Sequence, residues 1–345
     1  MDAAPLDSRY AGMAAALAER HAQPLWDRYH HITTREPRAS DAPMAWAWAD
    51  MEPLVDRAAR EVAMEDAERR VLLLTHPAFG GRVATTTNLA GGLQTLLPGE
   101  VALAHRHSLQ AIRFVMSGSG AVTTVNRQRC VMHEGDLVLT PAWTWHEHTH
   151  PGSGRLVWFD GLDIPLLHHL DSMFFEVAGA DTPVFEPAPT GVALAPAGMD
   201  VLGPDPADGG VGSQASRYRY SWQRALDALQ ATPEQADGSR WLRYVDGRSG
   251  GAVLPTLDCY LLACARGRPT RATRSTSNAI CVVARGRGSS QVGAHTLGWQ
   301  QHDVFTLPHW NWISHTAASS DAVIFMMTDR EFLAMMGYLR EECKA

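Results

Sequence analysis

The sequence has no excess of positive charge. Its 345 residues carry 30 basic side chains against 37 acidic ones, which gives a formal net charge of −7. A protein that binds nucleic acid normally presents a basic face that neutralises phosphates, so this class is excluded. Hydrophobic residues make up 45% of the chain and charged residues 19%. This composition excludes a disordered protein, and the length predicts two domains.

Cysteine is also scarce, and long apolar runs are absent. The five cysteines are odd in number and form no C-x-x-C pair. This excludes a disulfide framework or a thiolate zinc site and favours reduced thiols. No apolar run reaches the roughly 18 residues that span a bilayer. Residues 1–9 carry acidic side chains where a secretory signal is basic. We therefore expect a cytoplasmic protein without membrane contact.

Short apolar segments of β type begin near residue 70. Gly, Pro and Asn interrupt them about every ten residues, which is typical of an antiparallel sandwich or barrel. Helical periodicity is clearest in residues 8–22 and 221–231, and a capping-box pattern at 328–331 predicts a helix through Arg340. Residues 178–216 are rich in Pro, Gly, Ala and Asp and are expected to be a connector. The expected strands are 71–74, 111–115, 121–125, 137–140 and 156–159.

The two β-rich parts repeat the same motifs. The run that begins at Ile112 and is followed by Gly118 recurs at Ile280, followed by Gly286. Gly135-Asp136 and the Pro-x-Trp-x-Trp motif after it recur as His302-Asp303 and a second Pro-x-Trp-x-Trp motif. The offset between the copies is 168 residues early in the repeat and 167 late. An offset this constant predicts that one β-barrel unit has been duplicated.

The fold class expected from these patterns is mainly β, with two barrels joined by a linker. The expected parts are an N-terminal helical arm (1–69), an N-terminal barrel (70–177), a linker with a short helix (178–250), and a C-terminal barrel followed by a helix (251–345).

Histidine is concentrated in the first copy, where six of the chain's 16 histidines lie between His105 and His150. In a strand, residues i and i+2 point to the same face, so His105 and His107 can reach one ion while Arg106 points away. His146, at the end of a later apolar run, is well placed as a third ligand. Neutral imidazoles suit iron, zinc, copper or nickel. The alternative for His105 and His107 is a surface pair.

The second copy lacks these groups. The places of the three histidines are taken by Thr273, Ser275 and Ile313. Because isoleucine cannot ligate, we expect the second barrel to hold no metal. Its four histidines fall elsewhere and are interpreted as structural or surface groups; they are His295, His302, His309 and His315.

The spacing around the first-copy histidines resembles the two motifs of the cupin superfamily. Gly99-x5-His105-x-His107 is followed by Gly135-x5-Pro141-x4-His146. The resemblance implies a bicupin, with two double-stranded β-helix (jelly-roll) barrels and N-terminal, linker and C-terminal helices. Cupins usually supply a glutamate soon after the histidine pair, but Ala111 or Ile112 stands there in this chain. Three neutral ligands leave a divalent ion its full charge and three open positions for a bidentate anion and dioxygen.

Seven stretches carry a wider resemblance; they are 67–72, 92–94, 98–102, 104–108, 112–115, 139–148 and 158–165. They resemble the gentisate 1,2-dioxygenase family, which includes salicylate and 1-hydroxy-2-naphthoate dioxygenases. The resemblance implies Fe(II), a small aromatic 2-hydroxy acid and O2 as substrates, ring cleavage between the carboxyl- and hydroxyl-bearing carbons, and a homotetramer. Gentisate, cleaved to maleylpyruvate, is the leading substrate. The alternatives are salicylate, a substituted salicylate or 1-hydroxy-2-naphthoate, or a cupin that binds a small ligand without redox chemistry.

Two residues are expected to act directly on the substrates. Arg113 shares a strand face with Ala111, and its guanidinium would bind the substrate carboxylate unless it forms a structural ion pair. His148 resembles a histidine of the family that protonates or orients bound oxygen, unless a loop after Trp145 turns it outward.

Three further residues match pocket positions of the family. Gln94 would hydrogen-bond the substrate, or it is a core amide with backbone partners. Asp160 would accept the proton of a 5-hydroxyl group, or it is a turn aspartate. Arg69 would add an anion contact, or it is a solvated arginine at a helix end. The tryptophans expected in the core are Trp143, Trp145 and Trp158.

One position departs from the family. Many members carry Tyr or Trp just before the Gly-Leu-Gln segment, where this chain has Ala90 followed by two glycines. The small side chain leaves space beside the ring for a substituent or a larger substrate. This departure leaves the substrate open without affecting the metal ligands.

Overall fold

The computed structural model describes residues 11–178, 200–204 and 218–344. The chain divides into two compact units, Met1–Arg38 and Ala39–Ala345. The first unit contains helices α1 (Ala11–Ala18) and α2 (Leu25–Ile32). Strand β1 (Ala45–Trp46) and helix α3 (Trp48–Glu61), which the sequence analysis assigns to an N-terminal arm, lie in the second unit. The other domain boundaries remain predictions.

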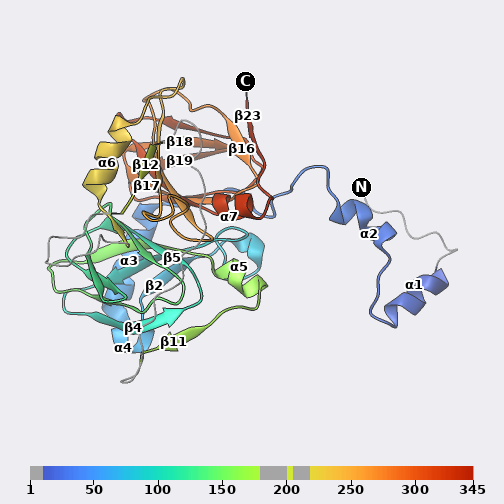
Figure 1. Cartoon of the computed structure of the whole chain (residues 1–345), viewed down its shortest axis with the longest axis horizontal. Helices are drawn as coiled ribbons and strands as arrows, with labels where there is room; N and C mark the ends of the chain where they lie inside the picture. The colour runs from blue at the N-terminus through green and yellow to red at the C-terminus, as the bar shows by residue number, and fades with distance from the viewer. Residues whose placement is uncertain (1–10, 179–199, 205–217, 345) are drawn as a thin grey trace. The chain divides into compact units, whose positions relative to one another are not determined.

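Two antiparallel sheets form the first barrel, drawn in blue to green in Figure 1. The strands expected at 71–74, 111–115, 137–140 and 156–159 all lie in one of them, which is buried on both faces. Its order is β13 (Arg219–Tyr220), β8 (Leu137–Thr140), β5 (Ala111–Ser117), β10 (Leu156–Leu162), β3 (Ala90–Leu96) and β2 (Val71–Leu74). The other sheet has the order β11 (Phe175–Val177), β4 (Val101–His107), β9 (His146–Thr149), β6 (Val122–Val125) and β7 (Gln128–Val131).

The second barrel, drawn in orange in Figure 1, repeats this order strand by strand. This confirms the bicupin fold. Its larger sheet has the order β1, β20 (Val304–Leu307), β17 (Ala279–Arg285), β22 (Val323–Thr328), β15 (Asp258–Ala263), β14 (Arg240–Tyr244) and β12 (Asp200–Leu202). Its smaller sheet has the order β19 (His295–Gln300), β18 (Arg287–Val292), β21 (Ile313–Ala317), β16 (Thr273–Ser275) and β23 (Glu341–Cys343).

The larger sheets of the two barrels pack against each other and share one hydrophobic core. Phe114 of β5 and Phe325 of β22 stack with ring centroids 4.2 Å apart and an interplanar angle of 11°. Gly161 of β10 lies so close to the second barrel that a Cβ there would approach Sδ of Met327 to 2.1 Å. The absence of a side chain at this position therefore allows the two sheets to approach closely.

Each barrel is completed by an arm whose helix packs on the other barrel. Strand β1 pairs with β20 of the second barrel, and the backbone N–H of Trp48 donates to Oδ1 of Asp303 at 2.7 Å. Helix α3 then packs on β3 of the first barrel, where Arg155 pairs with Glu52 at 2.8 Å. This segment therefore crosses from one barrel to the other.

The second arm crosses in the opposite direction. Strand β13 pairs with β8 of the first barrel, and the backbone N–H of Trp222 donates to Oδ1 of Asp136 at 2.9 Å. Helix α6 (Trp222–Ala231), at the place expected from 221–231, then packs on β14 of the second barrel. The duplication therefore includes these arms as well as the barrels.

The predicted C-terminal helix through Arg340 is wrong. Helix α7 (Arg330–Met335) is short, and Gly337, with a φ of 74°, follows its end. The capping box is absent because Oδ1 of Asp329 accepts from the backbone N–H of Asn278 at 2.8 Å instead. Most of the expected connector 178–216 lies outside the described residues. The remaining short helices are α4 (Met64–Ala67), η2 (Pro77–Phe79) and α5 (Ile164–His169).

No helix in the described part of the chain is long and apolar enough to cross a membrane.

Candidate active site

Three histidines meet inside the first barrel. His105 and His107 lie on β4, and His146 lies on the neighbouring β9, directly opposite His105. One ring nitrogen from each lies within 4.8 Å of the other two. The side chains are 1–5% exposed, so the surface-pair interpretation is wrong. This group can hold a metal ion.

Backbone carbonyls orient two of these rings. Nδ1 of His107 lies 3.0 Å from the carbonyl oxygen of Leu109, and Nδ1 of His146 lies 2.9 Å from that of Thr144. A carbonyl only accepts, so each Nδ1 carries the proton and each Nε2 keeps its lone pair for a metal. Nε2 of His146 is buried and has no hydrogen-bond partner among the described residues. A buried nitrogen without a partner is costly, and a bound metal ion removes that cost.

The histidines are held neutral. Burial, which disfavours the charged form, lowers the pKa of His105 to about 2 and that of His107 to about 4. Burial also lowers the pKa of His146 well below its usual value. The positive charge of Arg113 acts in the same direction on all three. The neutral ring is the form that binds metal, so the electrostatics fit a metal ion.

A buried ion pair lies beside the histidines. Arg113 of β5 stands opposite Asp160 of β10, with Nε 3.5 Å from Oδ1. Nη1 of Arg113 donates to Oγ1 of Thr140 at 2.6 Å, its one hydrogen bond among the described residues. The ion pair considered as the alternative for Arg113 is thus present. Asp160 lies inside a strand, so its interpretation as a turn residue is wrong.

Asp160 keeps one oxygen free for another donor. Its Oδ1 also accepts from Nε1 of Trp158 at 2.9 Å, whereas Oδ2 has no hydrogen-bond partner among the described residues. Burial raises the pKa of Asp160 to about 6, although Arg113 opposes this shift. Trp158 is fully buried and its ring lies 5.4 Å from that of His148. It is a core residue, as expected, but it also lines the site.

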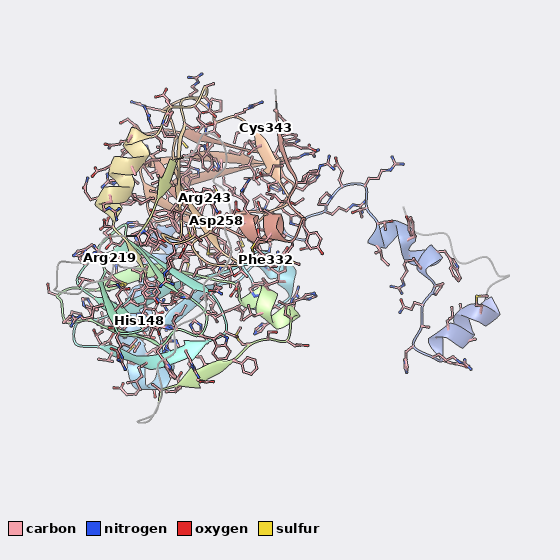
Figure 2. The ribbon with its side chains drawn as sticks, in the orientation of Figure 1. His148, Arg219, Arg243, Asp258, Phe332 and Cys343 are labelled. Atoms are coloured by element: carbon pink, nitrogen blue, oxygen red, sulfur yellow. The ribbon has the colours of Figure 1, made fainter. Side chains whose placement is uncertain are left out.

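His148 points inward. It lies on β9 on the same face as His146, with no exposed surface, so the outward alternative is wrong (Figure 2). Its Nδ1 is 2.9 Å from Oγ1 of Thr123, and its Nε2 has no hydrogen-bond partner among the described residues. Burial lowers its pKa well below the usual value, and Arg113 adds to this shift.

Two further expected residues lie beside the site. Gln94 of β3 is buried opposite Trp158, and its Nε2 has no hydrogen-bond partner among the described residues. Arg69 is not solvated: its side chain is 18% exposed, and Nη2 donates to the carbonyl of Leu103 at 3.0 Å and contacts Nδ1 of His105. The interpretation of Arg69 as a solvated helix-end residue is therefore wrong.

The sequence analysis missed the residues that support the expected ones. Thr140 and Thr123 hold Arg113 and His148, and the ring of Phe175 lies 5.2 Å from that of His105. Strand alternation places Thr123 on the inner face, but a buried threonine has no special sequence signal. Trp143 is not in the core as expected, because it is 37% exposed.

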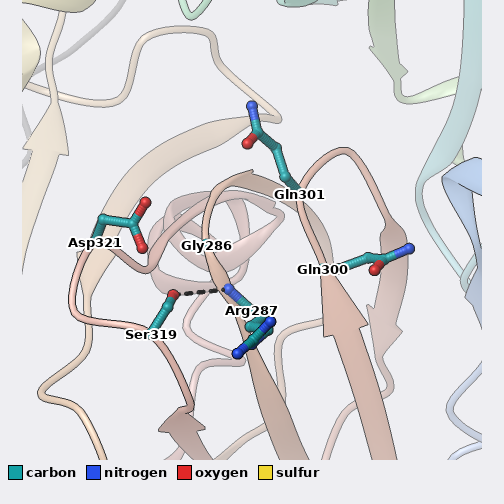
Figure 3. A pocket seen from close by; sticks show the side chains of 6 residues that line it. All are labelled: Gly286, Arg287, Gln300, Gln301, Ser319 and Asp321. Carbon is teal, nitrogen blue, oxygen red and sulfur yellow. Dashed lines mark hydrogen bonds between the residues drawn. The ribbon is translucent and has the colours of Figure 1, made fainter.

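A separate hollow lies on the second barrel. It has a volume of about 440 Å³ and opens between the turns that follow β17, β19 and β21 (Figure 3). Its lining residues are polar or small and contain no cluster of metal ligands: Gly286, Arg287, Gln300, Gln301, Ser319 and Asp321. It is therefore unrelated to the histidine site.

Comparisons with known proteins agree with this geometry. Residues 92–164 match the family described as Cupin domain. The chain is 34% identical over 325 residues to gentisate 1,2 dioxygenase 1 of Aquipseudomonas alcaligenes, covering 92% of each chain. It is 33% identical over 355 residues to 5-aminosalicylate 1,2-dioxygenase of Comamonas sp, covering 99% of this chain and 91% of that one. The crystal structure of a salicylate 1,2-dioxygenase from Pseudaminobacter salicylatoxidans superposes with a TM-score of 0.83 at 28% identity, covering 99% of both chains.

The barrels, the histidine group and these relatives agree. The chain belongs to the gentisate and salicylate 1,2-dioxygenase family, bicupin oxidoreductases that cleave an aromatic ring and incorporate two oxygen atoms.

Proposed function

We propose that the chain is an Fe(II)-dependent dioxygenase that inserts both atoms of O2 into gentisate, between the carboxyl- and hydroxyl-bearing carbons, to give maleylpyruvate. The observation that carries the proposal is the group of three buried, neutral histidines beside a buried arginine–aspartate pair. The family supplies the reaction class, and the side chains around the histidines suggest the substrate.

His105, His107 and His146 would hold the iron. When bound, the iron would bring the 2-hydroxy acid and O2 together and pass electrons from the ring to oxygen. Three neutral ligands leave the positive charge of the ion uncompensated, which favours an anionic substrate.

Arg113 would bind the substrate carboxylate. Its guanidinium has five N–H donors and uses Nη1 in its one hydrogen bond among the described residues, so it can still form a bidentate pair with a carboxylate. Arg69, held against His105, would add positive charge on the same anion. Gln94 would donate from Nε2, which has no hydrogen-bond partner among the described residues.

Asp160 favours gentisate over an unsubstituted salicylate. Its free Oδ2 can accept a hydrogen bond from the 5-hydroxyl group, which increases the electron density of the ring. With a pKa raised to about 6, Asp160 is mostly ionised at neutral pH. His148, oriented by Thr123, would hold or deliver a proton at Nε2 during ring opening.

One observation favours the alternative substrates. Ala90, at the start of β3, is buried and lies opposite Leu162, which packs on an apolar cluster with Leu109 and Leu167. This wall offers a ring substituent room and no polar partner. Salicylate, a substituted salicylate or 1-hydroxy-2-naphthoate is therefore the second candidate.

We further propose a cytoplasmic homotetramer. Support for assembly comes from large apolar side chains exposed on β4 and β11, where Leu103 is 69% exposed, Val177 55% and Phe175 51%. Isolated exposed apolar residues are common, but a group on neighbouring strands is typical of an interface.

A substrate panel tests the proposed function. The protein is loaded anaerobically with Fe(II), mixed with gentisate, salicylate, 5-aminosalicylate or 1-hydroxy-2-naphthoate, and oxygen uptake is recorded. We expect the fastest uptake with gentisate, and we expect Asp160→Asn to slow gentisate more than salicylate. No uptake with any 2-hydroxy acid would refute the dioxygenase, and faster uptake with 1-hydroxy-2-naphthoate would favour the second candidate.

A further inference from the structure

We propose that the second barrel, which has no metal ligands of its own, positions two of the three metal ligands of the first barrel through Thr256. The proposal rests on the metal site proposed above. It assigns a role in metal binding to a residue about 90 positions beyond the first barrel in sequence.

The contact between the barrels is a short hydrogen bond to a buried carboxylate. Thr256, in the loop before β15 of the second barrel, donates from Oγ1 to Oδ2 of Asp163 at 2.6 Å. Asp163 precedes helix α5 and is 1% exposed. Its other oxygen, Oδ1, accepts from the backbone N–H of Gln110 at 2.8 Å. Thr256 therefore holds the acceptor that fixes Gln110.

Gln110 connects two loops of the first barrel. Its backbone lies in the loop after β4, and its Oε1 accepts from the backbone N–H of Ala142 at 3.0 Å, in the loop before β9. We call the set Thr256, Asp163, Gln110 and Ala142 the clamp. Its three hydrogen bonds join the second barrel to both loops.

These two loops orient the metal ligands. Leu109, next to Gln110, supplies the carbonyl that holds Nδ1 of His107. Thr144, two residues after Ala142, supplies the carbonyl that holds Nδ1 of His146. Partners that fix the second ring nitrogen of a ligating histidine determine the direction of its metal-binding lone pair. The clamp therefore acts on His107 and His146 through their carbonyl partners.

The duplicated barrel contains a matching clamp without ligands. Asn88, 168 residues before Thr256, donates from Nδ2 to Oδ2 of Asp329 at 2.9 Å. Asp329 accepts from the backbone N–H of Asn278 at 2.8 Å, and Oδ1 of Asn278 accepts from that of His309 at 3.2 Å. Because the loops of the second barrel orient no metal ligands, breaking this clamp serves as the matched control.

The experiment compares Thr256→Val with Asn88→Ala and Thr256→Ser. The metal affinity of each purified protein is measured by anaerobic competition between Fe(II) or Co(II) and a chelator. The Co(II) absorption spectrum reports the ligand geometry. We expect Thr256→Val to lose about tenfold in affinity with an altered spectrum, as changes around a metal ligand typically do. Thr256→Ser, which keeps the hydroxyl, and Asn88→Ala are expected to match the unmodified protein.

The possible results each decide the proposal. Equal affinities and spectra for Thr256→Val and the unmodified protein would overturn it, as would an equal loss in Asn88→Ala. Urea unfolding of the metal-free variants separates loss of fold from loss of positioning. If Thr256→Val does not fold, Gln110→Met, which breaks only the link to Ala142, replaces it with the same expected loss. If the unmodified protein binds metal but cleaves no ring, the proposed function fails while the affinities still test the clamp. If it binds no metal, both proposals fail.

Discussion

The two barrels have the same strand order but differ in what fills them. Arg113 faces Asp160 across β5 and β10, and at the same register of the second barrel Cys281 faces Met326. Gln94 and Trp158 correspond in the same way to Leu262 and Ile324, and Thr140 to Leu307. These second-barrel residues all belong to or pack on one hydrophobic cluster. Loss of the metal ligands has therefore been accompanied by conversion of the polar interior into an apolar core.

The outer faces of the histidine-bearing sheet and its counterpart have been conserved between the copies. Arg106 lies over the ring of Trp145 at 4.9 Å and pairs with Glu176. Arg274 lies over the ring of Trp312 at the same distance and pairs with Glu342. The contrast shows that the duplicated scaffold was retained where it stabilises the strands and changed where it surrounded the metal.

One histidine of the second barrel falls at a repeat position that the sequence analysis overlooked. His315 occupies the place of His148, and Ser290 lies 2.7 Å from its Nδ1, in the place of Thr123. It is buried, as a structural histidine should be. A hydroxyl-bound histidine at this place is therefore part of the shared scaffold, and the first barrel uses it beside its metal ligands.

The largest effect is expected from exchanging the ligands between the barrels. His146→Ala should lower metal affinity by more than about 100-fold, beyond the loss caused by removing a neighbouring hydrogen bond. The reciprocal change Ile313→His should create no second site, because Thr273 opposite it supplies no imidazole. Metal content per chain, measured after dialysis, checks both. A second equivalent of metal in Ile313→His would contradict the difference between the barrels.

A smaller effect is expected at the Arg113 position. Arg113→Met removes the proposed carboxylate partner and leaves Asp160 buried without its ion pair. A hydrogen bond to a charged group contributes about 1.5–3 kcal/mol, so kcat/KM should fall roughly 10- to 100-fold. Cys281→Ala, the matched change in the second barrel, should leave kcat/KM unchanged. Steady-state kinetics with gentisate would contradict the assignment if both variants behaved alike.

The smallest effect is a pH dependence that belongs to the second barrel. Burial lowers the pKa of His315 from 6.5 to about 4. The unfolded chain therefore binds this proton more readily, and stability falls as the pH decreases from 6.5 to 4, by at most about 3 kcal/mol. His315→Asn, which can still bond Ser290, should remove this part of the acid sensitivity. Urea unfolding of the metal-free protein at pH 7 and pH 4.5 measures it, and equal acid losses in both proteins would contradict it.

Much of the fold was predictable because its signals are local or repeated. Strand alternation placed His105 and His107 on one face, and the constant offset revealed the second barrel. The C-terminal helix was mispredicted because Asp329 bonds Asn278, about 50 residues away in sequence, instead of capping its own helix. Arg69 was misjudged for a similar reason, since its position depends on a strand that begins about 30 residues later. Contacts between distant segments decide such positions, and they leave no pattern in the nearby sequence.

The crossed arms bear on how the chain arose. A symmetric dimer in which each subunit extends a strand and helix onto its neighbour has the same contacts that β1–α3 and β13–α6 make here. Gene fusion of two such subunits would preserve every contact and free one copy from catalysis. The ancestor inferred from this arrangement is a domain-swapped dimer of single-barrel proteins with two equivalent sites, of which one survives.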